Sequence, residues 1–397
     1  MDKTQDIHNY QKRLDRMIER IQSPEELSEH NSKIAIRFKN ELLVQNISVS
    51  KVGRYLQDVI WLSRQLNRKN FDDVNRDDVK DLLARMNQSS LSENTKKGIK
   101  IMLRKFYKFI RGVEGNGKYP PEVDFFTLNI SNANKLIPEE LLTEEDMAKL
   151  IRAAKNYRDK ALIALLCESG CRVGEIGALR IKHVSFEEYG ARITVKGKTG
   201  MRKIIVINST PFLHNWLNNH PHAEDPESPL WIGQTDEFLS YARISSILEF
   251  SVKHSGIKKR VYPHILRHSR ATLLAKSLSD STLKNYLGWS AGSKMAGVYI
   301  HMSGKDTDEA ILKANGIEIK KEIKENPLKP RECLRCHTKN PCTNSFCSQC
   351  GLPLNEESAM KIIESETNRK QADEIMNKLI QDKEILELIK KKLACEN

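Results

Sequence analysis

The chain has 397 residues, of which 39% are hydrophobic, and this length is sufficient for two or three domains. Its formal net charge of +13 favours a polyanionic partner such as nucleic acid, although a basic excess also serves plain solubility. The N-terminus is polar, and the longest apolar run, 161–167, is far shorter than the ~20 residues of a membrane span, so we expect a cytoplasmic protein with reduced thiols.

The first part of the chain is predicted to be helical. Residues 1–30 favour a short amphipathic N-terminal helix, and residues 31–114 favour a strongly charged helical domain. The last helix of this domain has apolar residues at spacings of four, three and four, which predict one buried face: Ile99, Leu103, Phe106 and Ile110. Another face is basic and lacks acidic residues, which favours phosphate contacts over a merely solvated surface: Lys97, Lys100, Arg104, Lys108 and Arg111.

A linker is predicted over 115–140, because Gly and Pro are frequent between 112 and 121. A second domain is predicted over 141–316. It begins near Thr143, a typical N-cap residue that is followed by three acidic residues in the first turn. Within it we expect a β-hairpin and several helices, at about 144–155, 158–169 and 173–180 and again from about 210 onward.

The C-terminal part has its own organisation. A second linker is expected at 317–331, a cysteine module at 332–353 and an amphipathic helix at 354–397. In the second domain, the strands of the hairpin are expected at 192–195 and 203–207. The predicted fold class is therefore mainly α with a small antiparallel β element, an α+β arrangement.

The second domain contains the residues that chemistry on a phosphodiester requires. Attack on DNA without a metal needs a nucleophile, cations that hold the developing charge, and an acid for the departing 5′ oxygen. Arginine suits the second task because its fork donates two hydrogen bonds to phosphate oxygens. The domain offers such groups in this order: Arg172 near a helix N-terminus, lysines at 196–200, His264 and Arg267 on one helix face, Trp289 after a Leu-Gly pair, and Tyr299.

This ordered set resembles the tyrosine recombinase (phage integrase) family over roughly 143–308. The arginine box of the family is matched by 169–175, its His-x-x-Arg-His motif by 264–268 and its Leu-Gly-His/Trp motif by 287–289. The family's hairpin lysine follows a glycine, which favours Lys198 over Lys196 and Lys203. The resemblance implies this catalytic set: Arg172, Lys198, His264, Arg267, Trp289 and Tyr299.

The resemblance also implies a role for each residue. Tyr299 attacks the scissile phosphate and forms a 3′-phosphotyrosine, and a 5′ hydroxyl is released. Arg172 and Arg267 hold the non-bridging oxygens, whereas Lys198 protonates the leaving oxygen. His264 assists proton transfer at the tyrosine, and Trp289, which stands where the family more often has His, donates its indole N–H to the phosphate or packs beneath Tyr299. Neither ATP nor a catalytic metal is implied, and His268 is expected to be structural.

The resemblance implies further properties. The domain at 31–114 is expected to be a SAM-like core-binding domain, and the partner is expected to be double-stranded DNA with a specific recombination site. A homotetramer is expected on paired sites, with monomers or dimers away from DNA. The alternatives are relaxation of DNA by a type IB topoisomerase, which shares much of the chemistry, and a non-catalytic DNA-binding regulator with a zinc ribbon.

Five of the eight cysteines lie between 333 and 350. Two Cys-x-x-Cys pairs separated by ten residues predict a structural, tetrahedral zinc ribbon with ligands Cys333, Cys336, Cys347 and Cys350. Cys342 is the spare thiol, and His337 is a possible substitute ligand. The Cys-x-x-Cys-His pattern of haem attachment is set aside because a second Cys-x-x-Cys pair is present. Cys167 and Cys171 are expected to be buried as small apolar groups.

Overall fold

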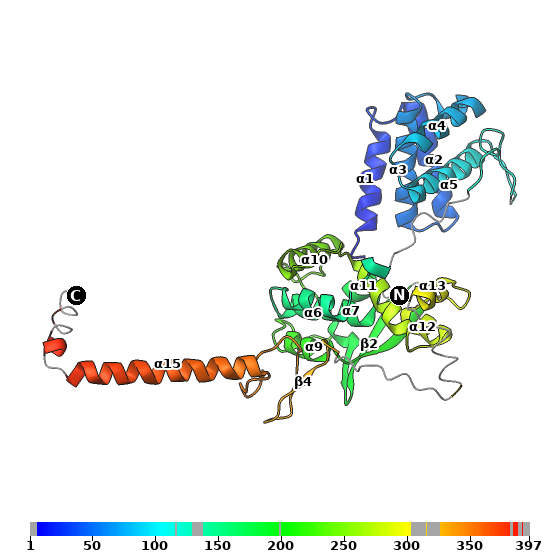
Figure 1. The fold of residues 1–397 in the computed structure, drawn as a ribbon. Coiled ribbons are helices and arrows are strands. Elements are labelled where there is room, and N and C mark those ends of the chain that lie inside the picture. The colour runs from blue at the N-terminus through cyan, green and yellow to red at the C-terminus, as the bar shows by residue number, and fades with distance from the viewer. Residues whose placement is uncertain are drawn as a thin grey trace. The chain divides into compact units, whose positions relative to one another are not determined.

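A computed structural model describes residues 6–115, 117–128, 138–197, 200–302, 315, 326–381, 384–387 and 391. The chain divides into two compact units, Gln5–Ile137 and the remainder, Met1–Thr4 with Pro138–Asn397. Both units are built mainly from helices, and small antiparallel sheets lie in the second unit (Figure 1). The predicted fold class is therefore confirmed. In the described part of the chain, no helix is long and apolar enough to cross a membrane.

Side-chain caps define where helices of the N-terminal unit begin. Ser28 accepts a hydrogen bond from the backbone N–H of Asn31, and Ser92 caps its helix in the same way. Asn75 and Asp78 form a capping box, in which each side chain accepts a backbone N–H from the other residue. The elements are α1 (Tyr10–Gln22), α2 (Glu29–Val44), α3 (Val49–Gln65), η1 (Phe71–Asp73), α4 (Arg76–Gln88) and α5 (Glu93–Ile110).

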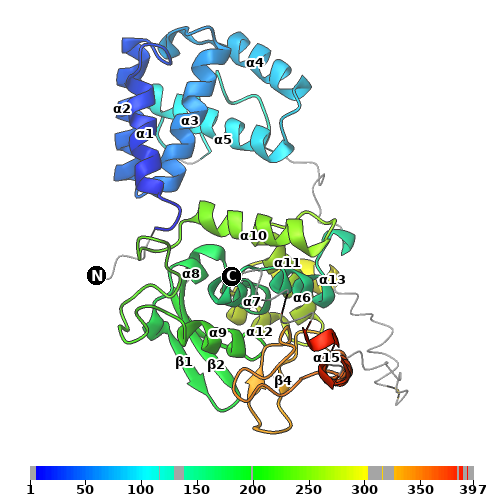
Figure 2. The ribbon, with the colours of Figure 1, turned by 90° about the vertical axis from the view of Figure 1, so that its left-hand side faces the viewer.

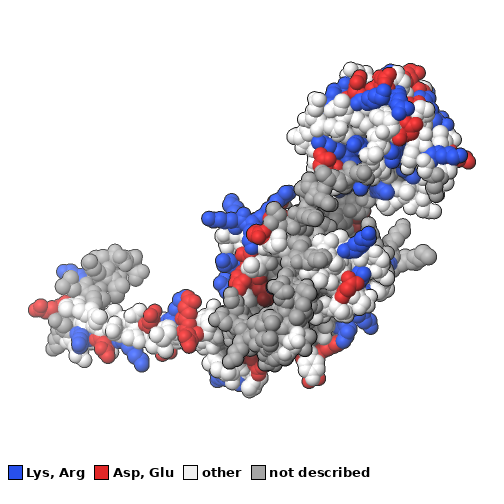
Figure 3. Space-filling view, turned by 45° about the vertical axis from the view of Figure 1, so that its right-hand side comes forward, with Lys and Arg blue, Asp and Glu red and all other residues white. Residues whose placement is uncertain are grey.

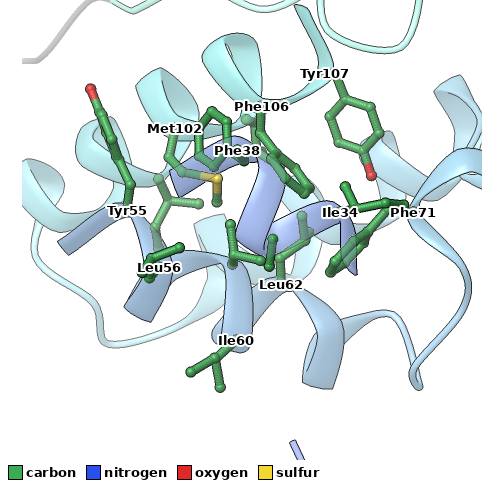
Figure 4. Close-up of a cluster of buried hydrophobic side chains, with 14 of the residues drawn as sticks. Ile34, Phe38, Tyr55, Leu56, Ile60, Leu62, Phe71, Met102, Phe106 and Tyr107 are labelled. Atoms are coloured by element: carbon green, nitrogen blue, oxygen red, sulfur yellow. The ribbon is translucent and has the colours of Figure 1, made fainter. Parts of the chain in front are cut away.

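Aromatic side chains meet in the core of this unit (Figure 4). Phe106 of α5 packs edge-on against Phe38 of α2 and Phe71 of η1, with ring centroids 5.0 Å apart in each pair. The predicted buried face of α5 is confirmed at Ile99, Leu103 and Phe106. Ile110 is only partly buried, because it stands at the last position of the helix.

The N-terminal unit is larger than the predicted domain 31–114. Leu14 and Ile21 of α1 are buried in its core, so the N-terminal helix belongs to the same unit. Val123 and Phe126 are also core residues, although the Gly and Pro content suggested a linker from 115 onward. Apolar side chains within 117–128 thus fold this segment back onto α5, and the remaining predicted linker, 129–137, lies outside the described residues.

In the second unit, Thr143 is the N-cap of α6, as predicted, and forms a capping box with Asp146. The predicted helices at 144–155, 158–169 and 173–180 correspond to α6, α7 and α8, although α6 and α8 end earlier than predicted. The helical elements are η2 (Pro138–Glu140), α6 (Glu144–Arg152), α7 (Tyr157–Ser169), α8 (Val173–Gly177), η3 (Ile181–His183), α9 (Thr210–Leu217), α10 (Tyr241–Ser255), α11 (Pro263–Ala275), α12 (Asp280–Leu287) and α13 (Met295–Met302).

The predicted hairpin is confirmed and belongs to a three-stranded antiparallel sheet in the order β1-β2-β3 (Figure 2). Its strands are β1 (Val184–Glu187), β2 (Gly190–Gly197) and β3 (Gly200–Val206). Strand β1 was not predicted, because four residues with mixed exposure carry little alternation. The register pairs Val195 with Arg202 and Lys196 with Met201, so Arg202 shares the inward face with buried Val195.

Helix α7 is the central helix of this unit, and its side chains from Ala161 to Ser169 are buried. Its Glu168 carboxylate accepts hydrogen bonds from the backbone N–H groups of Ile207, Asn208 and Ser209 and thereby fixes the chain between β3 and α9. Cys167 and the nearby Cys171 are buried, as expected for small apolar side chains.

The C-terminal part has a two-stranded sheet, β4 (Arg331–Glu332) and β5 (Lys339–Asn340), followed by α15 (Glu356–Gln381). Leu328 is buried and lines a small cavity together with Ile151 and Phe212, and β5 contacts α9, so the cysteine module packs on the rest of the second unit. The predicted C-terminal helix is present over α15, whose side chains are largely exposed.

Candidate active site

Arg172 stands at the N-terminal end of α8. Gly170 ends α7 in a left-handed conformation with φ 59°, and the chain then turns so that Arg172 precedes α8 as its N-cap. The Glu175 carboxylate accepts one hydrogen bond from the Arg172 backbone N–H and another from its guanidinium, both at 3.0 Å. The Arg172 side chain remains 31% exposed, so part of its guanidinium faces outward.

Glu175 also binds Arg202, which the sequence alone did not single out. Arg202 reaches from β3 and donates to Glu175 Oε2 at 2.8 Å and to the Tyr286 carbonyl at 2.9 Å. Burial by itself disfavours the carboxylate, but the hydrogen bonds and charges of Arg202 and Arg172 hold the pKa of Glu175 below its ordinary value. Arg202 thus joins the sheet to the arginine box.

Two glycines make room for this ion pair. A Cβ atom at Gly197 would lie 2.3 Å from Glu175 Oε1, and one at Gly288 would lie 2.5 Å from an Arg202 guanidinium nitrogen. Gly288 also has φ 65°, which a side chain would strain. The glycine of the Leu-Gly-Trp motif is therefore required by a close approach of Arg202.

Arg267 of α11 is buried, with 4% exposure, and bridges two other segments of the site. Its guanidinium donates to the Gly170 carbonyl at 2.9 Å and to the Leu287 carbonyl at 2.8 Å. Burial and the nearby Arg172 charge lower its pKa to about 10, so it remains charged at neutral pH. Among the described residues, no carboxylate forms an ion pair with Arg267.

Trp289 lies between Arg267 and Tyr299. The Arg267 guanidinium carbon is 5.3 Å from the Trp289 ring centroid, and the indole stacks on the phenol of Tyr299 with centroids 5.4 Å apart and planes 4° from parallel. Tyr299, on α13, is only 2% exposed. Burial raises the pKa of its phenol to about 12, so the phenol is neutral at physiological pH.

The two histidines of α11 occupy different places. The imidazole of His268 makes a hydrogen bond through Nδ1 with the Tyr299 hydroxyl, although the sequence suggested a structural role for His268. The His264 ring lies 5.8 Å from the His268 ring. Burial and the charges of Arg267 and Arg172 lower the pKa of His264, and burial together with His264 and Arg267 lowers that of His268 to about 4. At neutral pH both imidazoles are therefore neutral.

The predicted catalytic lysine, Lys198, lies outside the described residues, at the hairpin between Gly197 and Gly200. The alternatives Lys196 and Lys203 lie on β2 and β3. The register places both on the face opposite Arg202, because neighbouring residues along a strand alternate between faces.

The structure brings together the predicted Arg172, His264, Arg267, Trp289 and Tyr299, which are separated by up to 127 positions in the chain. Two guanidinium groups, those of Arg172 and Arg202, share the Glu175 carboxylate, and a third, that of Arg267, has no carboxylate partner among the described residues. Such an excess of fixed positive charge beside a tyrosine is suited to an anion that reacts with that tyrosine.

Comparison with known proteins agrees with this geometry. Residues 140–305 match the phage integrase family. The second unit therefore contains a phage integrase domain. The chain is 28% identical over 289 residues to a tyrosine recombinase of Pseudothermotoga lettingae, and the match covers 71% of this chain and 98% of that protein. The predicted family is thus confirmed, and the topoisomerase and regulator alternatives are not favoured.

Solved structures share the fold of this integrase chain. XerH recombinase bound to palindromic difH substrate, a post-cleavage complex, matches with a TM-score of 0.54 and 18% identity over 80% of this chain and 98% of that one. A lambda integrase tetramer bound to a Holliday junction matches with a TM-score of 0.55 and 17% identity over 74% of this chain and 80% of that one.

The basic face of α5 in this integrase chain has internal partners. The Arg104 guanidinium lies between the rings of Tyr119 and Phe126, at 4.4 and 4.9 Å, and donates to the Phe126 carbonyl. Arg111 pairs with Glu122 at 2.8 Å, and Lys108 donates to the Gly115 carbonyl. Among the described residues, neither Lys97 nor Lys100 has an ion pair or a side-chain hydrogen bond, so DNA contact through this face stays a prediction.

Charges elsewhere on the N-terminal unit of the integrase are mixed. Lys and Arg side chains are interspersed with Asp and Glu side chains over the face that Figure 3 shows. An exposed group of one sign is therefore not evident on that face. A DNA contact through this face would depend on particular side chains rather than on a broad positive surface.

The four predicted metal ligands of the integrase chain come together. The Sγ atoms of Cys333, Cys336, Cys347 and Cys350 all lie within 4.8 Å of one another, an arrangement that could hold a metal ion. Cys342 is buried outside this group, and His337 instead faces Glu332, with Nδ1 3.0 Å from its carboxylate.

The two Cys-x-x-Cys turns have the same backbone construction. In each turn, the backbone N–H of the residue after the second cysteine donates a hydrogen bond to the carbonyl of the first cysteine. The His337 N–H lies 2.9 Å from the Cys333 carbonyl oxygen, and the Gly351 N–H lies 3.0 Å from that of Cys347. His337 and Gly351 both have positive φ, 57° and 74°. Backbone N–H groups of the second turn lower the pKa of Cys347 to about 6, which favours its thiolate.

Proposed function

We propose that this chain is a site-specific DNA recombinase that cuts and rejoins DNA through a 3′-phosphotyrosine at Tyr299. The carrying observation is a buried tyrosine that contacts an imidazole, within a site where two guanidiniums share one carboxylate and a third has no carboxylate partner among the described residues. A phosphodiester brings the missing negative charge. The nucleophile, the charge-stabilising groups and a proton acceptor that phosphoryl transfer requires are then all in one place.

In the reaction, the Tyr299 oxygen attacks phosphorus and the bond from phosphorus to the 5′ oxygen breaks. Arg172 and Arg267 hold the non-bridging oxygens, and we assign protonation of the leaving oxygen to Lys198. His264, on the helix that carries Arg267, assists the transfer of the phenolic proton from Tyr299. Trp289 orients the phenol by stacking on it. Rejoining reverses each step, so the phosphate bond energy is retained and ATP is not consumed.

The burial of Tyr299 requires a rearrangement on DNA binding. A side chain that is 2% exposed does not meet a phosphate from solution, so the segment around α13 has to shift when DNA occupies the site. We propose a homotetramer on two double-stranded sites as the active assembly, by likeness to the lambda integrase tetramer on a Holliday junction, and the cytoplasm as its place of action.

A denaturing gel tests the reaction. Wild-type protein is incubated with a pool of duplexes that carry a nick beside a randomised stretch, so that the short released strand diffuses away. We expect an adduct that survives denaturation and is lost in Tyr299→Phe, which retains the ring stack on Trp289. Tyr286→Phe is the matched control and retains the adduct. A Tyr299→Phe protein that still forms the adduct would contradict the assignment.

A plasmid assay separates recombination from relaxation. A recombinase acts on the sites recovered from the adduct pool and joins two of them in one reaction. We expect recombinant products from plasmids that carry paired sites and little relaxation of a plasmid without one. Rapid relaxation of every supercoiled plasmid, with no recombinant product, would support a topoisomerase instead.

We also propose that the cysteine tetrad holds zinc with a structural role. A set of four thiolates in two similar turns is typical of tetrahedral zinc. Cys333, Cys336, Cys347 and Cys350 would hold the ion, and binding would contribute folding energy to a module too small for a core of its own.

Metal analysis tests this zinc proposal. We expect one zinc per chain, and a chelator should open 332–353 to proteolysis while the rate of adduct formation stays within a few-fold. Cys347→Ser should bind less zinc, whereas Cys342→Ser, the matched control outside the tetrad, should bind it normally. Equal zinc content in both variants would contradict the ligand set.

A further inference from the structure

The Glu175 carboxylate is held by two arginines at once. Each of its oxygens accepts one hydrogen bond from Arg172 and one from Arg202. Oε1 lies 3.0 Å from an Arg172 guanidinium nitrogen and 3.2 Å from an Arg202 guanidinium nitrogen. Oε2 lies 3.0 Å from the Arg172 backbone nitrogen and 2.8 Å from the other terminal nitrogen of Arg202. A carboxylate offers about four acceptor positions, so these bonds use its full capacity and hold it in one orientation.

The donors of Arg202 are directed into the protein. Its Nε donates to the Tyr286 carbonyl at 2.9 Å, and a terminal nitrogen lies 3.3 Å from the Sγ atom of Cys171. Together with the two bonds to Glu175, these contacts use four of the five N–H groups of the guanidinium. The Arg202 side chain is 13% exposed, whereas that of Arg172 is 31% exposed. Arg202 is therefore suited to act on a phosphate through another residue rather than directly.

The C-terminal end of α12 binds all three arginines of the site. The last carbonyls of a helix have no partner within it, and the helix dipole favours cations beside them. Three successive carbonyls accept one guanidinium each: Tyr286 from Arg202, Leu287 from Arg267 and Gly288 from Arg172. The bonds that hold Arg202 are made to residues 171–175 and to this end of α12, and none of them is made to α13, the segment that shifts when DNA binds.

Loss of Arg202 would change both the place and the charge of Arg172. Glu175 would then pair with Arg172 alone and would compensate the positive charge that a phosphate needs. The carboxylate would also be free to turn, because half of its hydrogen bonds would be gone. A displacement of about 1 Å in a group that holds the substrate can slow a reaction by about 10²-fold.

We propose that Arg202 is a positioning residue of the cleavage reaction, which holds Glu175 and thereby sets the orientation and the uncompensated charge of the Arg172 guanidinium at the phosphate. Arg202 stands four residues after Lys198, and a Cβ atom at Gly197 would lie 2.3 Å from Glu175 Oε1. The same ion pair thus lies against the base of the hairpin that carries the proposed acid. This inference rests on the proposed recombinase function and adds a residue to its site.

A double-mutant cycle tests whether Arg202 acts through Arg172. Single-turnover adduct formation is measured with a nicked duplex recovered from the adduct pool, well below the unfolding temperature of every variant. We expect Arg202→Met to slow the saturated cleavage rate by about 10²-fold, while the affinity for DNA changes by no more than about threefold. In the Arg172→Ala background the same substitution should slow cleavage by less than about threefold, because the group that Arg202 positions is gone.

Two further variants complete the cycle. Arg202→Lys keeps a charge but cannot bind Glu175 with two donors and the Tyr286 carbonyl with a third, so its rate should lie between those of wild type and Arg202→Met. Arg192→Met is the matched control, because Arg192 lies on the neighbouring strand β2 in an exposed ion pair with Glu187. It should cleave within about twofold of the wild-type rate.

The outcomes separate this inference from the recombinase function. If Arg202→Met slows cleavage equally with and without Arg172, Arg202 acts independently of Arg172 and the positioning role is wrong. If Arg202→Met cleaves at the wild-type rate, the role is wrong as well. If the wild-type protein forms no adduct with any duplex, the recombinase function itself fails.

A measurement without DNA checks the positioning independently of activity. In protein labelled with ¹⁵N-arginine, the Nε–H signal of Arg172 is assigned by its loss in Arg172→Ala. We expect this signal to shift in Arg202→Met and to stay unchanged in Arg192→Met. An Arg172 signal that is the same in Arg202→Met as in wild type would overturn the proposal, because Glu175 would then hold Arg172 without Arg202. This readout decides the question even if the double variant cleaves too slowly to be measured.

Discussion

Arginines of the two units are held in similar ways but leave different amounts of charge uncompensated. In the N-terminal unit, Arg104 donates to backbone carbonyls and lies between two aromatic rings, and Arg111 has Glu122 as a partner. In the second unit, Arg267 also donates to two backbone carbonyls but has no carboxylate partner among the described residues. In the N-terminal unit the guanidinium groups hold a neighbouring segment in place, whereas in the second unit the Arg267 guanidinium keeps a positive charge that can bind an anion.

The difference shows why a basic pattern alone does not identify a binding surface. Arg104, Lys108 and Arg111 share a helix face with Lys97 and Lys100, and the sequence predicts one role for all of them. Three of these side chains instead bind Gly115, Glu122 and Phe126, which follow α5 in the chain. For DNA binding, the number of cations on a surface matters less than the number of their hydrogen-bond donors that have no partner within the protein.

The largest expected effect is on cleavage by Arg267→Ala. Removing a fixed guanidinium from the phosphate site should slow adduct formation by about 10³-fold or more. Arg270→Ala is the matched control, because Arg270 lies on the same helix and also donates to a backbone carbonyl, that of Glu168. Single-turnover rates with the nicked duplex measure both variants.

Stability separates chemistry from folding in this test. Arg267→Ala leaves the carbonyls of Gly170 and Leu287 without their partner, which costs about 1–3 kcal/mol. Arg267→Lys keeps a charge without the bidentate fork, and it should also be slow while losing less stability. If adduct formation were slow in Arg270→Ala and fast in Arg267→Lys, the guanidinium of Arg267 would not be the group that holds the phosphate.

The next effect concerns Glu175, the carboxylate that Arg172 and Arg202 share. Its folded pKa lies below the ordinary 4.5, so its charge stabilises the fold above about pH 4.5, and this contribution is lost as the pH falls through the folded pKa. Glu175→Gln should therefore be clearly less stable than wild type at pH 7, and the difference should narrow at pH 3. Urea unfolding at the two pH values measures this difference.

Glu187→Gln is the matched control, because Glu187 pairs with Arg192 on the exposed face of the same sheet. Exposed ion pairs contribute little, so we expect almost no change in the free energy of unfolding at either pH. A Glu175→Gln variant whose deficit is the same at pH 3 and pH 7 would show that the Glu175 charge does not stabilise the site.

The smallest effects are expected on α5. Arg104→Ala should lower the stability of the N-terminal unit by about 1–3 kcal/mol, because a stacked cation and its hydrogen bonds are lost. Lys100→Ala should leave stability unchanged, weaken DNA binding a few-fold and reduce the salt slope by about one. Thermal unfolding measures the stability of both variants, and binding at several salt concentrations measures their affinity for DNA and its salt dependence. A destabilised Lys100→Ala with an unchanged salt slope would remove Lys100 from the DNA interface.

The order of motifs along the chain predicts much of the site. Arg172, Arg267, Trp289 and Tyr299 were assigned because their motifs and their order resemble the tyrosine recombinase family, and the structure brings them together. The role of Arg202 was not accessible, because a single arginine in a short strand carries no local signal for a partner 27 residues earlier. His268 was noticed but given a structural role, since nothing in the sequence shows which histidine of α11 faces Tyr299.

The limits of the fold predictions have similar causes. Gly and Pro residues after Ile110 suggested a linker, yet Val123 and Phe126 supply enough apolar surface to hold that segment in the core. Helix starts at Thr143 and the cysteine turns were predictable because their signals are local. Contacts between distant segments, such as β5 with α9, depend on tertiary packing that no short pattern encodes.

The most direct test of the account is to identify the amino acid that becomes attached to DNA. The adduct from the nicked duplex is digested with protease and nuclease, and the peptide that carries a nucleotide is sequenced by mass spectrometry. The account predicts a single modified peptide with a 3′-phosphate ester on Tyr299. Attachment through another residue, such as Tyr286, or through the 5′ end of the broken strand, would contradict it.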